Sequence, residues 1–108
     1  MVWRLKIIAT DAIGVNPMFT NFNLPEGAKL FIYRPDYKQV LGAYTSANNH
    51  NSKQFASELI FGNTMILEYI EPASQRGNGS LTLSAVASFF KDVGVNPHSN
   101  QGFGDSEN

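Results

Sequence analysis

The chain has no cysteine among its 108 residues, so it has neither a disulfide framework nor a zinc site with thiolate ligands. Charge is also scarce: Asp, Glu, Lys and Arg make up 16 % of the residues, and the formal net charge is −1. Without a basic stripe to neutralise phosphates, we expect no nucleic-acid partner. No apolar run approaches the roughly 18 residues needed to cross a bilayer, so we expect no membrane span.

The start of the chain lacks a secretion signal. Residues 1–6 pass directly into a strand pattern, without the basic region, apolar run and small-residue cleavage site of a signal peptide. Two interpretations follow: the protein is cytoplasmic, or Met1 opens a domain excised from a longer chain. The length suffices for one domain with one core, but not for two.

What the chain does contain is a series of strand patterns, without any amphipathic helix. Residues 10–17 carry Gly and Pro and are predicted as a loop. Strands are expected near residues 2–9, 18–24, 28–33, 39–45, 54–61, 64–71 and 80–90. About seven strands separated by turns predict an all-β domain, an antiparallel β-sandwich of jelly-roll or Greek-key type.

The segment 22–45 holds the clearest turn signals. Pro25 and Gly27 supply the fixed φ and the left-handed φ of one turn, and Pro35 with Asp36 provides a second turn ten residues later. These turns predict a three-stranded antiparallel meander. Gly62 and Asn63 predict a further hairpin between segments 54–61 and 64–71.

The composition changes near the C-terminal end. Residues 93–108 are rich in Gly, Asn and Ser and show no periodicity. We therefore predict a β-sandwich domain at residues 1–92 and a flexible linker or tail at 93–108, leading toward a C-terminal domain absent from this chain.

No group of residues predicts catalysis. Gly104-Asp105-Ser106 echoes the nucleophile segment of trypsin-like proteases, but the glycines that complete that motif are missing. The two histidines, His50 and His98, lie in a loop and in the tail. A triad of either with Asp92 or Asp105 would have no rigid scaffold, and a zinc site would need a third ligand.

The remaining polar candidates are carboxylates. Glu68 and Glu71 flank Tyr69 and Ile70 at the end of a strand, and Glu68 lies on the polar face of that strand, so solvation explains Glu68. Asp11 with Asn16, or Asp36, offers loop oxygens for calcium, but the spacing matches no defined calcium loop. We therefore assign no catalytic residue, no cofactor and no metal ligand.

Aromatic residues are more numerous than one inner sheet face requires. Either both sheet faces are partly covered within the sandwich, or some rings form a platform for a sugar or a patch for a partner domain. The residues from which we predict a ligand or partner patch are Tyr33, Tyr37, Tyr44 and Phe61.

Several segments resemble the N-terminal β-domain of secreted, lysyl-endopeptidase-like (trypsin-like) serine proteases of Bacteroidetes-type bacteria. The two most specific segments are LPEGAKLFIY at 24–33 and ILEYIEP at 66–72, in that order. Weaker matches lie at 22–23, 40–45, 48–49, 55–56, 62–65 and 81–86, so that the resemblance covers residues 2–92.

The resemblance implies a non-catalytic module of a secreted or cell-surface protein, without its signal peptide in this chain. In that family a C-terminal protease domain follows, which opens with a cysteine-containing stretch and carries the catalytic triad. This chain ends before any such cysteine, so no family catalytic residue falls on it. The expected partner is that protease domain of the parent chain, and the alternative is a glycan- or ligand-binding jelly-roll module.

Overall fold

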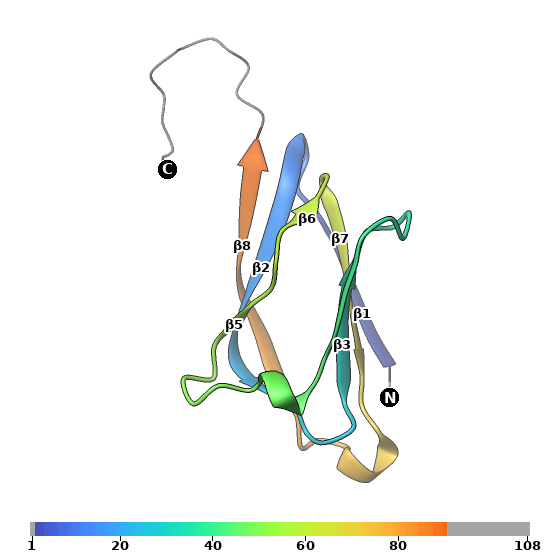
Figure 1. Ribbon diagram of the computed structural model, residues 1–108, viewed down its shortest axis with the longest axis vertical. Coiled ribbons are helices and arrows are strands. Elements are labelled where there is room, and N and C mark those ends of the chain that lie inside the picture. The colour runs from blue at the N-terminus through green and yellow to red at the C-terminus, as the bar shows by residue number, and fades with distance from the viewer. Residues whose placement is uncertain (1, 91–108) are drawn as a thin grey trace.

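A computed structural model describes residues 2–90, which form eight strands in two antiparallel sheets (Figure 1). The sheets face each other as a β-sandwich, so the predicted all-β fold class is confirmed. Two three-residue 3-10 helices, η1 (Ser46–Asn48) and η2 (Ala73–Gln75), lie in connections. Within this part of the chain, no helix has the length and apolarity to cross a membrane.

The first sheet has the strand order β1-β7-β3-β4. Its strands are β1 (Val2–Ile8), β7 (Thr64–Ile70), β3 (Lys29–Tyr33) and β4 (Val40–Tyr44). The second sheet is built on the long strand β2 (Ala12–Asn23), which pairs with β8 (Ser80–Phe90) along one edge. The short strands β5 (Phe55–Ala56) and β6 (Ile60–Phe61) share the other edge of β2.

Two predicted hairpins are instead connections between the sheets. The turn at 24–27 leads from β2 in the second sheet to β3 in the first, and the turn at Gly62 and Asn63 leads from β6 to β7. The predicted meander is therefore wrong in its first half, and only β3 and β4 pair. The turn residues reverse the chain in both cases. Because Phe22 and Leu24 are buried between the sheets, the first turn leads across the core to the other sheet.

Strand β2 begins six residues earlier than predicted. Residues 12–17 were expected in a loop because of Gly14 and Pro17, yet they pair with β8. On the opposite edge, β6 pairs with Gly14 and Val15, and β5 pairs with Met18 and Phe19. Pro17 thus falls between these two pairings, where a missing N–H breaks no ladder on that edge. The single strand predicted at 54–61 is likewise two short strands.

Phenylalanine side chains fill the core between the sheets. The rings of Phe22 and Phe55 stack with their centroids 4.5 Å apart, and Phe19 lies 5.8 Å from Phe22. Across the core lie Leu30 and Ile32 of β3, both fully buried. Because Phe22 is fully buried and Phe61 is exposed, removal of the two rings should lower the free energy of unfolding by different amounts.

We predict that Phe22→Ala lowers the free energy of unfolding by about 3–5 kcal/mol, because it removes a buried ring and leaves a cavity. The matched control Phe61→Ala removes a ring that is 59 % exposed and should change stability by less than about 0.5 kcal/mol. Urea denaturation of both variants measures the difference. Equal losses would contradict the described core.

Candidate functional site

The two sheets differ in width, and one strand is left partly uncovered. In the described part of the chain the first sheet is four strands wide, whereas the second is three wide at any level because β5 and β6 share one edge of β2. At one side, Tyr44 of β4 packs edge-on against Phe55 of β5, with centroids 4.8 Å apart. At the other side, β1 extends beyond the cover of β8.

The inner face of β1 shows this lack of cover. Trp3 and Leu5 pair across the ladder with Tyr69 and Leu67 of β7, which are both buried. Trp3 is nevertheless 42 % exposed and Leu5 37 % exposed. Trp3 therefore faces an open space between the sheets rather than a packed core, and Leu5 lies two residues farther along the same face.

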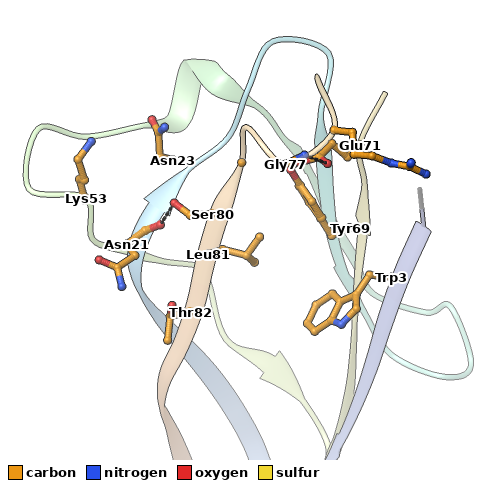
Figure 2. Close-up of a pocket in the computed structure, with 12 residues that line it drawn as sticks. Trp3, Asn21, Asn23, Lys53, Tyr69, Glu71, Gly77, Ser80, Leu81 and Thr82 are labelled. Atoms are coloured by element: carbon orange, nitrogen blue, oxygen red, sulfur yellow. Dashed lines mark hydrogen bonds between the residues drawn. The ribbon is translucent and has the colours of Figure 1, made fainter. Parts of the chain in front are cut away.

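This space is a cleft of about 830 Å³, which we call the β1–β8 cleft (Figure 2). Trp3 and Leu81 point toward each other from β1 and β8, and Tyr69 lies between those two strands with its hydroxyl at Glu71. The complete lining is Trp3, Asn21, Asn23, Lys53, Tyr69, Glu71, Arg76, Gly77, Gly79, Ser80, Leu81 and Thr82. The cleft thus combines an apolar interior with amide, hydroxyl and cationic groups.

Glu71 is the buried carboxylate of the cleft. Its residue exposure is 4 %. The Tyr69 hydroxyl donates a hydrogen bond of 2.8 Å to Oε2, and the Gly77 N–H donates one of 3.1 Å to Oε1. The Tyr69 bond, followed by the Gly77 bond, holds the pKa of Glu71 below its ordinary value. Burial and then the Glu71 hydrogen bond raise the pKa of Tyr69.

Gly79 is required by the close approach of the chain to this pair. A Cβ atom at residue 79 would clash with the Tyr69 hydroxyl, and it would lie 2.7 Å from Pro25 Cδ and 2.8 Å from Glu71 Oε2. The absence of a side chain therefore lets the segment between η2 and β8 close the end of the cleft.

A second candidate site lies on the outer face of the first sheet. The rings of Tyr33 and Tyr37 stack with their centroids 5.3 Å apart and an interplanar angle of 16°. Tyr33 is buried beneath Tyr37, which is 70 % exposed. Together with Arg4, Glu68 and Phe31, these rings line a hollow of about 560 Å³, completed by Val40 and Ile66.

Glu68 accepts two hydrogen bonds in this hollow. Arg4 Nε donates to Oε1 at 2.8 Å, and the Tyr33 hydroxyl donates to the same oxygen at 3.0 Å. The Arg4 bond, followed by the Tyr33 bond, lowers the pKa of Glu68. Burial, followed by the bond to Glu68, raises the pKa of Tyr33. The group is a fixed set of polar atoms beside an exposed ring.

The four residues of the predicted patch do not lie together. Tyr33 and Tyr37 share the outer hollow, but Tyr44 is partly buried against Phe55 at the rim of the core. Phe61 lies on β6 in the other sheet, beside a shallow hollow that includes Pro35. Of the predicted patch, only Tyr33 and Tyr37 are therefore neighbours, and the other two rings lie apart from them.

The weaker polar candidates are also dispersed. Asn16 donates to the Ser57 carbonyl, while the Asp36 carboxylate accepts from Arg34 Nη2 at 2.9 Å. Among residues 2–90, no group of three or more His, Asp or Glu side chains is placed to hold a metal. The candidates Asp92, His98, Asp105 and Ser106, and the boundary predicted at residue 92, lie outside the described residues.

Sequence reasoning missed the β1–β8 cleft. The alternation of Trp3, Leu5 and Ile7 correctly predicts an inner face for β1, but it does not reveal whether a second sheet covers that face. The alternation in 80–90 is also misleading, because a register shift between Met18 and Phe19 moves the inner face of β8 from Leu83 to Val86.

We predict that Glu71→Gln lowers the melting temperature at pH 7, because the amide is a weaker acceptor for Tyr69 and Gly77. Folding lowers the pKa of Glu71 from its ordinary value of 4.5. The ionised carboxylate therefore stabilises the fold above pH 4.5, and this stabilisation is lost as the pH falls through the lowered pKa. The difference between wild type and variant should therefore shrink below pH 4.5. Scanning calorimetry across pH measures it.

The matched control is Glu58→Gln, which makes the same exchange at an exposed position. It should leave the melting temperature almost unchanged across the same pH range. A constant difference between wild type and Glu71→Gln from pH 7 to pH 2 would contradict the assigned role of the carboxylate.

No family model matches the chain, and no solved structure gives a significant match to it.

Proposed function

We propose that the chain is a non-catalytic β-sandwich module of a secreted serine endopeptidase, which docks against the protease domain of its parent and helps it to fold or positions it. The observation that carries the docking role is the β1–β8 cleft, which Trp3 lines, together with the exposed Leu5 farther along the inner face of β1. The identity of the partner rests on the resemblance of residues 24–33 and 66–72 to such modules.

The cleft suits a protein partner because its apolar groups are contiguous. Trp3, Leu81 and the Tyr69 ring line one space rather than lying singly on the surface. Burial of apolar surface contributes roughly 25 cal/mol per Å². A partner that fills the cleft therefore gains most from Trp3 and Leu81, because Tyr69 is already buried. Exposed apolar patches of this kind mark interaction sites.

The polar groups at the cleft add specificity to that docking. Asn21, Asn23 and Lys53 lie along its β2 side and supply amide and ammonium groups. Polar groups around an apolar centre are the usual composition of a protein interface. A partner therefore inserts apolar side chains between the sheets and meets hydrogen-bonding groups around them.

We predict that Leu5→Glu in the parent protein lowers the yield of folded protease and its activity on lysine-containing substrates by about tenfold, equivalent to about 1.4 kcal/mol. The carboxylate would be desolvated when the protease domain covers β1. The matched control Ile13→Glu places the same charge at an exposed position of β2, in the other sheet. Unchanged yield and activity for Leu5→Glu would contradict the docking role.

A second candidate function is glycan binding at Tyr37. The observation that favours it is the exposed Tyr37 ring, supported from behind by Tyr33 and flanked by the Arg4–Glu68 ion pair. Sugar rings stack on such aromatic faces, and the adjacent guanidinium and carboxylate are suited to hydroxyl groups.

We predict that a polysaccharide bound by the wild-type chain binds about tenfold more weakly to Tyr37→Ala, which corresponds to about 1.4 kcal/mol. Phe61→Ala is the control, because it removes another exposed ring from the opposite sheet. A glycan array followed by calorimetry provides the measurement. Absence of binding by the wild type to every polysaccharide would exclude this function.

A further inference from the structure

We propose that the outer edge of β1 accepts an additional strand from a partner protein, in which apolar residues alternate with carboxylates. The inference rests on the proposed docking function and specifies its geometry. Three features of β1 carry it: its free backbone groups, the apolar row on its inner face and the basic row on its outer face.

The backbone of β1 pairs on one side only within residues 2–90. The Ala9 N–H bonds the Asn63 carbonyl at 2.8 Å, in register with the β1–β7 ladder. Backbone groups of alternate residues in a strand point to the same side, so Trp3, Leu5 and Ile7 also bond β7. The N–H and C=O groups of Val2, Arg4, Lys6 and Ile8 therefore point to the free edge.

The inner face of an added strand would meet apolar side chains. Trp3 and Leu5 are exposed on the first sheet, and Leu81 faces Trp3 from β8. A fifth strand beside β1 places every second side chain into this space. Those side chains must be apolar in order to cover Trp3 and Leu5, so the strand completes the core at the side that β8 leaves open.

The outer face would meet two cations. Arg4 and Lys6 alternate with the apolar row and are both exposed. Arg4 is bonded to Glu68, whereas Lys6 forms no ion pair with any residue that the structure describes. Residues that lie opposite each other in an antiparallel pair share a face, and opposite charges there are stabilising. The added strand therefore carries carboxylates on this face.

A second copy of the chain is a poor occupant of this edge. An antiparallel β1–β1 pair that keeps the apolar rows on one face centres on residue 4, 5 or 6. These registers place Arg4 opposite Arg4, Arg4 opposite Lys6, and Lys6 opposite Lys6, respectively. Like charges opposite each other are destabilising, and lysines on edge strands commonly prevent self-association.

The test uses the full chain and a synthetic peptide, acetyl-Glu-Val-Glu-Val-Glu-Val-Glu-amide. Trp3 is the only tryptophan in the chain and lines the cleft, so its fluorescence reports occupation directly. We expect a saturable blue shift of the emission, together with amide NMR shifts concentrated in residues 2–8. A peptide with Lys in place of Glu should bind at least tenfold more weakly, and one with N-methylated backbone groups should not bind.

Two variants separate charge from fold. Lys6→Glu should lower the affinity for the Glu peptide and raise the affinity for the Lys peptide, each by severalfold. The matched control Lys29→Glu makes the same exchange on β3, which has paired neighbours on both sides, and should leave both affinities nearly unchanged. Circular dichroism of the two variants verifies that each remains folded.

Four results would overturn the proposal. These are no effect of the Glu peptide on Trp3, equal binding of the Glu and Lys peptides, binding of the N-methylated peptide, or a concentration-dependent dimer that shifts the Trp3 emission. If the peptide fails while Leu5→Glu still impairs the parent protein, docking stands and only strand addition is wrong.

Discussion

The unequal width of the two sheets is the constraint on which the open side of this molecule depends. Strand β2 is long enough to pair with β8 along one edge and with β5 and β6 in succession along the other. Because β5 and β6 share that edge, the second sheet gains no fourth strand at any level within residues 2–90. The facing sheet does have a fourth strand, and β1 consequently lacks complete cover.

Strand positions could be predicted from the sequence because they are local properties. The alternation of Trp3, Leu5 and Ile7 and the apolar spacing of β7 both identify strands correctly. Sheet membership depends on where the next strand packs, and local residues do not encode it. Pro25 and Gly27 reverse the chain as predicted, but β2 and β3 bury Phe22 and Leu30 against each other from opposite sheets. The same turn residues therefore connect two strands of different sheets instead of two neighbours in one sheet.

The sites were less predictable than the fold. Glu71 follows a strand and has the sequence pattern of a surface residue, yet Tyr69 and the Gly77 N–H bury it with satisfied hydrogen bonds. Only the backbone path between η2 and β8 brings Gly77 there, and that path has no periodic signal. Similarly, Tyr33 and Tyr37 are near in sequence and stack, whereas Tyr44 packs against Phe55 and Phe61 lies on β6 in the other sheet.

Arg4 connects the two surfaces that we consider functional. Its backbone belongs to the free edge of β1, while its guanidinium bonds Glu68 beneath Tyr33 and Tyr37. A carboxylate on an added strand would compete with Glu68 for this guanidinium, and Glu68 would then rely on the Tyr33 hydroxyl. Lys6 has no such competitor in the described residues, so it can attract a partner's carboxylate without disturbing the tyrosine pair. If the added strand's carboxylate binds Lys6, the outer hollow keeps its Arg4–Glu68 contact. If the carboxylate binds Arg4 instead, that contact is weakened and the hollow changes.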